Sequence, residues 1–134
     1  MDSLICQTLK DIEIICVNDG STDNSLSIIQ DYMQKDSRIK VIDKANAGYG
    51  HTMNRGLEVA KGEFIGIVES DDFIKNNMFE VLYTTAIEKN VDIVKSSFMY
   101  FWGNKDLIQP SELLRFSDYY KVVNPLEEQA IFWL

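Results

Sequence analysis

The stretch IEIICVNDGSTDNS, residues 12–25, decides the fold of this chain. It opens on a nearly continuous apolar run, EIICV at residues 13–17, which is typical of a strand buried on both faces. The turn formers NDGSTD at residues 18–23 close that run, and apolar residues then recur at helical spacing. The stretch therefore predicts a strand, a tight turn and an amphipathic helix that packs on a sheet.

The same alternation of strand and helix continues along the chain. Short apolar strands are expected at RIKVI (38–42), EFIGIV (63–68) and VDIVK (91–95), with helical stripes between them that end at Gly62 and Asn90. Strands that alternate with helices in this way imply parallel β-α-β units. We therefore predict an α/β fold, a doubly wound and mostly parallel sheet with flanking helices.

Both ends of the sequence have the pattern of interrupted elements. Residues 1–9 resemble the last turns of an amphipathic helix with no strand in front of it, although an α/β domain of this kind normally starts with a strand. Asn124 and Pro125 form a good helix start, and that helix would reach the last residue with apolar side chains at its end. We expect a single partial domain over residues 1–134.

The charge balance excludes several classes of protein. The 134 residues hold 13 Lys+Arg against 21 Asp+Glu, a formal net charge of −8. Nucleic-acid and membrane-surface proteins rely on basic patches, so we expect no nucleic-acid partner. No apolar stretch is long enough for a transmembrane segment, the first residues lack a signal-peptide pattern, and the two cysteines show no CxxC spacing. These features predict a cytoplasmic protein.

Carboxylates gather in an acidic turn, ESDD at residues 69–72, directly after the expected strand at 63–68. Open α/β sheets bind their ligands beyond the carboxyl ends of their strands. One interpretation is a solvated turn before a helix. In the other interpretation, a bound cation offsets the repulsion among the three carboxylates. Carboxylate oxygens suit Mg²⁺ or Mn²⁺, and a substrate diphosphate would bind the same ion. The metal would then supply the positive charge that an acidic chain needs to bind phosphates.

Further candidate residues lie in two other loops. Asp19 follows the first expected strand, and it either contacts a ligand or stabilises the turn itself. NAGYG at residues 46–50 forms a glycine loop before a helix N-terminus, a place that favours anions. His51, the sole histidine, is either a metal ligand or a polar residue of the helix start. Tyr49 and Arg55 are either ligand contacts or surface residues.

Taken together, the motifs resemble a known family. IEIICVNDGSTDNS, followed by NAGYGHTMNRGLEVAKGEFIGIVESDD at residues 46–72, looks like the nucleotide-sugar-binding half of a glycosyltransferase family 2 enzyme of the GT-A fold. The resemblance covers about residues 3–100. Its motifs are specific, because the strand, the turn, the glycine loop, an A-x-G-E-[FY]-I strand and SDD occur in the family's order and spacing. Residues 101–134 would begin the acceptor-side region.

The resemblance implies roles for three aspartates. Asp19 would hydrogen-bond the nucleotide base, Asp71 would contact the ribose or sugar, and Asp72 would bind a divalent metal (Mn or Mg) that bridges the diphosphate. The implied reaction transfers a sugar, with inversion, from a nucleotide diphosphate sugar to a hydroxyl of a saccharide or lipid-linked acceptor. A UDP-sugar is the expected donor. Such enzymes commonly build bacterial surface polysaccharides, in the cytoplasm or peripheral to the membrane.

The sequence departs from the family pattern at two places. Family members begin with a strand of the type VSIIIPVYN and a helix ending in SLLNQT, whereas here SLICQT at residues 3–8 matches the helix end without the strand. The family's general base is normally an Asp in a second acidic motif. The tail carboxylates Glu112, Asp118, Glu127 and Glu128 form no convincing copy of that motif. The general base is therefore expected outside this chain, and the catalytic residue is left unassigned.

Two alternatives to a glycosyltransferase stay open at this point. One is an inactive truncated fragment of a transferase, which differs from an enzyme by the absence of turnover. The other is a receiver-like, non-enzymatic signalling domain that binds Mg²⁺ through Asp71 and Asp72, with Asp19 as its phosphoacceptor. A receiver also needs a Lys beyond the end of a later strand, and Lys95 lies within its expected strand.

Overall fold

The computed structural model describes residues 1–100 together with residues 109 and 110. Its contacts divide the chain after Val81, and the two parts are described in turn. The elements of the first part, in chain order, are α1 (Asp2–Ile5), β1 (Ile14–Asp19), α2 (Ser25–Lys35), β2 (Ile39–Lys44) and α3 (Tyr49–Val59).

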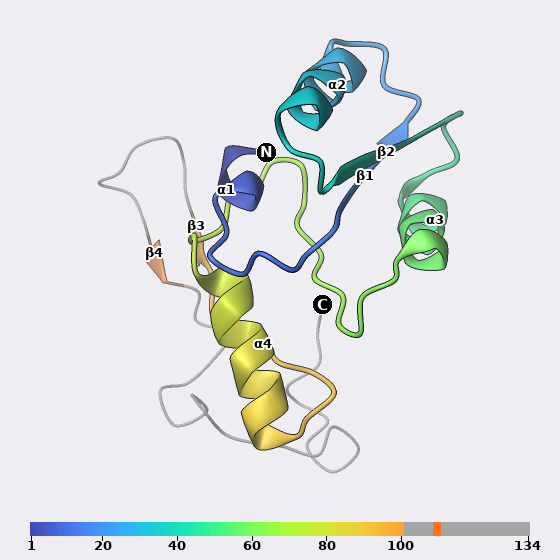
Figure 1. Ribbon diagram of the computed structural model, residues 1–134. Coiled ribbons are helices and arrows are strands. Elements are labelled where there is room, and N and C mark those ends of the chain that lie inside the picture. Colours follow the sequence, from blue (N-terminus) through green and yellow to red (C-terminus); the bar gives the residue numbers. More distant parts are fainter. Residues whose placement is uncertain (101–108, 111–134) are drawn as a thin grey trace. The chain divides into compact units, whose positions relative to one another are not determined.

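A parallel pair of strands forms the centre of the first part. β1 and β2 run in parallel, with Ile14 opposite Ile39 at one end and Asp19 opposite Lys44 at the other. Ile14 and Ile39 are buried, so the apolar beginnings of the two strands form the core of the pair. Helix α2 packs against β2 and α3 against β1, and the two helices lie on opposite sides of the strands (Figure 1). Parallel strands flanked by helices confirm the predicted fold class.

The helix α3 comes close to β1 because of a glycine. A Cβ added at Gly56 would meet the Val17 side chain at 3.6 Å, an ordinary packing distance. The helix begins at Tyr49, inside the NAGYG motif, and Ala60 follows its last residue, two positions before the predicted end at Gly62. Gly48 precedes the helix with φ +87, a conformation in which other residues are strained. The glycine loop therefore leads directly into the helix.

The strand predicted at residues 63–68 is wrong: these residues are irregular. Ile65 and Ile67 are more than half exposed in this segment. A strand needs a neighbouring strand to which its backbone can hydrogen-bond, and among the described residues β1 and β2 pair with no further strand. The segment is held instead by packing, since Gly66 lies so close to the Phe79 ring that an added Cβ would be 2.4 Å from it.

A buried glutamine anchors the N-terminal segment. Gln7 is fully buried, and its Nε2 donates to the carbonyls of Ser3 (2.9 Å) and Lys75 (2.8 Å). Its Oε1 accepts from the Phe79 backbone N–H at 3.1 Å, and this amide lies in the first turn of α4 (Met78–Lys89). Gln7 therefore caps a helix that is distant in sequence, which the short helical pattern at residues 1–9 did not predict.

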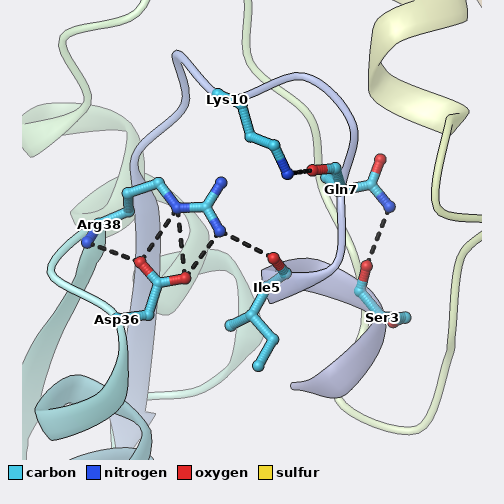
Figure 2. A network of polar contacts seen from close by, with 6 residues as sticks. All are labelled: Ser3, Ile5, Gln7, Lys10, Asp36 and Arg38. Carbon is cyan, nitrogen blue, oxygen red and sulfur yellow. Dashed lines mark hydrogen bonds and ion pairs between the residues drawn. The ribbon is translucent and has the colours of Figure 1, made fainter.

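An arginine joins the same segment to the start of β2. The guanidinium of Arg38 donates to the Asp36 carboxylate at 2.7 Å and to the Ile5 carbonyl at 2.9 Å, as Figure 2 shows. Arg38 lowers the pKa of Asp36 from 3.8 to about 2. Only residues 2–5 of the predicted N-terminal helix are helical, and the hydrogen bond from Arg38 to the Ile5 carbonyl holds the end of that helix.

The second part contains the end of α4 and a short hairpin-like pair, β3 (Met99–Tyr100) antiparallel to β4 (Gln109–Pro110). Asn90 ends α4 as predicted, in the left-handed conformation (φ 50). The strand predicted at residues 91–95 is wrong, since these residues are irregular. The helix predicted from Asn124 lies outside the described residues. None of the described helices is both long and apolar enough to cross a membrane.

Candidate functional site

Asp19, the last residue of β1, joins the first turn to the glycine loop. Its Oδ1 accepts from the Ala47 N–H at 2.9 Å and its Oδ2 from the Gly48 N–H at 3.0 Å. The ammonium group of Lys44 also donates to Oδ1. Two motifs that are separated by almost thirty positions are therefore connected through one carboxylate, at the carboxyl end of the strand pair.

Lys44 is a site residue that the sequence reasoning missed. It lies directly opposite Asp19 in the strand register, and its side chain is only 13% exposed. The hydrogen bond from Lys44 is the main reason why the pKa of Asp19 falls from 3.8 to about 2, and the Ala47 amide lowers it further. Asp19 is therefore ionised at neutral pH, and 22% of its side chain is exposed to solvent. Lys44 could have been identified from the register of the two parallel strands, which puts their last residues side by side.

The neighbouring pair on the two strands is polar as well. Asn18 is buried, lies opposite Asp43, and donates from Nδ2 to its carboxylate at 2.7 Å. Asn18 Oδ1 in turn accepts from the Ser21 N–H at 3.4 Å, which fixes the start of the NDGSTD turn. Successive residues of a strand point to opposite faces, so Asn18 and Asp19 place polar contacts on both faces at this end of β1.

The backbones of the two loops approach each other at Gly20. Its φ is +71, and a Cβ at this position would lie 2.8 Å from the backbone nitrogen of Asn46. Both the conformation and the close approach therefore require glycine here. The NDGSTD motif is specific at this position because no other residue lets the turn and the glycine loop meet.

The glycine loop is also tied to the acidic turn. The Tyr49 hydroxyl donates to Glu69 Oε1 at 2.5 Å, and this contact raises the pKa of the tyrosine. The Asp72 N–H donates to the Glu69 carbonyl at 3.1 Å, so residues 69–72 form a closed turn. Asp19, the glycine loop and the acidic turn are thus connected through Gly48 and its neighbour Tyr49.

The two aspartates of the acidic turn face solvent. Asp71 and Asp72 are exposed, as is His51 in the first turn of α3. Within residues 1–100, no three His, Cys, Asp or Glu side chains converge as a preformed metal site. His51 is a polar, exposed residue in the first turn of α3. The exposed carboxylates Asp71 and Asp72 remain available to a cation that a ligand helps to hold.

Parallel strands with a helix on either side, and polar side chains at the strands' carboxyl ends, define a domain of the doubly wound α/β class, whose members bind ligands at this edge. The profile of glycosyl transferase family 2 matches residues 1–132, and the chain belongs to this family. Its fold is therefore the Rossmann-like α/β fold named GT-A, as predicted. Family membership also sets the receiver-like alternative aside.

Individual relatives agree with this assignment. The uncharacterized glycosyltransferase EpsJ of Bacillus subtilis (strain 168) is 46% identical over 98 residues, which are 73% of this chain and 28% of the relative. Glycosyltransferase GlyG of Streptococcus pneumoniae serotype 4 is 44% identical over 99 residues, 73% of this chain and 33% of the relative. A cholesterol galactosyltransferase of Borreliella burgdorferi is 41% identical over 114 residues, 84% of this chain and 31% of the relative. The chain spans a third or less of the length of these relatives.

Proposed function

We propose that residues 3–100 form the nucleotide-sugar-binding half of an inverting glycosyltransferase and that residues 101–134 begin its acceptor-side region. The observation that supports this most is the position of Asp19. It is an ionised, partly exposed carboxylate at the carboxyl end of β1, held by two backbone amides of the glycine loop. In doubly wound sheets this edge is where nucleotides bind.

In this proposal each of the three aspartates binds a different part of the donor. Asp19 accepts an N–H of the base, and Asp71 accepts a hydroxyl of the ribose or of the sugar. The donor is a nucleotide diphosphate sugar, with a UDP-sugar preferred, and the ring N–H of its uracil would donate to the Asp19 carboxylate. The Tyr49–Glu69 contact supports the assignment, since it ties the loop beside Asp19 to the turn that carries Asp71.

Asp72 would hold a divalent cation, Mn²⁺ or Mg²⁺. Such ions are commonly bound by one or two carboxylates while substrate phosphates fill other positions, so a site with two exposed neighbouring carboxylates fits them without a third protein ligand. The chain carries a net charge of −8, which makes unassisted binding of a diphosphate unfavourable. When bound, the cation offsets the negative charge that develops on the departing diphosphate.

The acceptor half of the reaction would use groups outside residues 3–100. An inverting transfer needs a general base that takes the proton of the acceptor hydroxyl as the oxygen attacks the sugar carbon. We place this base outside the chain. The acceptor is a saccharide or a lipid-linked acceptor, in keeping with a role in surface polysaccharide synthesis in the cytoplasm or at the membrane periphery. A relative named for cholesterol as its acceptor is compatible with a lipid on the acceptor side.

The proposal is tested by separating the base from the diphosphate. Binding of uridine and of UDP with Mn²⁺ is measured by calorimetry on the full-length protein and its Asp19→Ala and Asp72→Asn variants. We expect Asp19→Ala to weaken both ligands and Asp72→Asn to weaken UDP alone. The control is Asp31→Asn, at an exposed position of α2, which should change neither affinity. An Asp19→Ala variant that binds uridine normally would contradict the proposal, and so would an Asp72→Asn variant that binds UDP normally.

A further inference from the structure

The carboxylate of Asp19 is already largely occupied. Oδ1 accepts from Lys44 and from the Ala47 N–H, and Oδ2 accepts from the Gly48 N–H. Thr52 lies near enough to lower the pKa of Asp19 as well, but its hydroxyl donates to the Gly48 carbonyl at 3.1 Å and carries only one proton. Lys44, Ala47 and Gly48 are therefore the donors that hold the carboxylate.

The number of unoccupied acceptor positions on Asp19 limits the hydrogen bonds that it can accept from a ligand. A carboxylate offers roughly two acceptor positions on each oxygen. Both positions of Oδ1 are taken, and one of the two on Oδ2 is taken. One position is left, on Oδ2, in a side chain that is 22% exposed. Asp19 can therefore accept a single hydrogen bond from a ligand without giving up one of its present partners.

Nucleobases differ in what they would present to such a group. The ring N3–H of uracil is a single donor between two carbonyls, and it matches one free acceptor position. Guanine presents a ring N–H and an amino group side by side, and it needs both oxygens of a carboxylate to pair the two donors. Cytosine presents an unprotonated ring nitrogen at the corresponding position, which a carboxylate repels. A polar group that is buried without its partner is costly, so the number of free acceptors separates these bases.

From this arrangement we infer that Lys44 is a specificity-determining residue. By occupying Oδ1, it restricts Asp19 to one incoming donor, and so the site accepts a uracil-type base and rejects guanine. The inference rests on the proposed function, since it needs Asp19 to face the base. Lys44 is suited to this role because the strand register fixes it opposite Asp19 and only 13% of its side chain is exposed. It does not itself contact the base.

The test compares nucleotides rather than activities. Affinities of UDP, GDP and CDP with Mn²⁺ are measured by calorimetry on the full-length protein and on Lys44→Met, which keeps most of the apolar stem and removes the donor. We expect the native protein to prefer UDP over GDP by at least about tenfold, and the variant to narrow that ratio by about tenfold, chiefly because GDP binds better. The control is Lys40→Met, which removes the Lys40–Glu13 ion pair from the same strand and should leave the ratio unchanged.

A modified ligand keeps the test independent of how the variant folds. UDP methylated at the uracil N3 lacks the single donor and should bind the native protein no better than GDP. Normal binding of the methylated ligand, or equal native affinities for UDP and GDP, would overturn the inference. So would an unchanged UDP to GDP ratio in a folded Lys44→Met variant. Failure of every nucleotide to bind the native protein would instead refute the proposed function itself, and the specificity role with it.

Discussion

The Tyr49 hydroxyl donates a 2.5 Å hydrogen bond to the Glu69 carboxylate, which connects the residue after Gly48 to the first residue of the acidic turn. The contact matters because Gly48 is itself held by Asp19 at 3.0 Å. A ligand that binds Asp19 and the acidic turn together would find the two halves of its site already joined. Preorganisation of this kind raises affinity by lowering the cost of ordering the site.

We expect Tyr49→Phe to weaken the metal-dependent binding of UDP by roughly two- to tenfold, because one charge-assisted hydrogen bond at an exposed position is lost. Binding of uridine alone should change little. Calorimetry with both ligands measures the difference. The matched control is Tyr32→Phe, which removes a 2.6 Å hydrogen bond to Asp2 outside the site. Equal losses in the two variants would show that Tyr49 has no special role.

Gly20→Ala should destabilise the protein by about 1–2 kcal/mol, because the residue has a positive φ and its new Cβ would press on the Asn46 backbone nitrogen. The glycine loop should move, so nucleotide affinity should fall too. Gly50→Ala is the control: the residue is helical and nothing lies within 4 Å of a Cβ there, so stability should stay unchanged or rise by up to about 1 kcal/mol. Thermal unfolding monitored by circular dichroism gives both values. A Gly20→Ala variant as stable as Gly50→Ala would contradict the close approach of the two loops.

The stability of the protein should decrease as the solution becomes acidic between pH 4 and pH 2. The folded-state pKa of Asp19 lies at about 2, below its ordinary value of 3.8, because of Lys44. A carboxylate with a depressed pKa contributes stability that is complete above the ordinary value and is lost as the pH falls through the folded value. Asp36 behaves in the same way through Arg38. Both ion pairs should therefore contribute to the acid sensitivity.

The contribution of Lys44 can be isolated with Lys44→Met, whose melting temperature should fall less steeply between pH 5 and pH 2 than that of the native protein. Lys89→Met, in the last turn of α4, removes the same charge away from both ion pairs and should keep the native slope. Identical slopes for Lys44→Met and the native protein would mean that Lys44 does not depress the pKa of Asp19.

Replacing Gln7 by Leu should destabilise the protein by about 2–5 kcal/mol. The substitution removes three hydrogen bonds and leaves the Lys75 carbonyl and the Phe79 amide without their partner. Gln30→Leu, at an exposed position of α2, is the control and should stay within about 0.5 kcal/mol. Urea titration of both variants decides the matter. Similar midpoints would show that the buried glutamine is not an anchor.

The local parts of the fold could be predicted from the sequence, because their signals lie within a few residues. The apolar run at 13–17 and its turn gave β1 correctly, and Asn90 marked the end of α4. The strand at 63–68 could not be settled in this way. Its residues are mostly apolar, but strand formation depends on a partner strand elsewhere in the chain, and β1 pairs with β2 alone among the residues described.

In the candidate site, too, local features could be predicted from the sequence and contacts between distant residues could not. Asp19 was found because it follows a strand at the edge where such sheets bind ligands. Lys44 was missed because a lysine at a strand end is usually solvated, and its partner is visible only once the register of β1 and β2 is known. Gln7 was missed for a similar reason, since its contacts reach residues more than sixty positions away.

The central claim is that the acidic turn binds the donor diphosphate through a divalent cation while Asp19 binds the base. The most direct test is a calorimetric titration of the full-length protein with UDP, first in the presence of Mn²⁺ and then with EDTA in excess. The account predicts saturable binding with Mn²⁺ that falls below detection when EDTA removes the metal, because the exposed carboxylates of Asp71 and Asp72 repel a diphosphate unless a cation lies between them. Equal affinity for UDP under both conditions would contradict it.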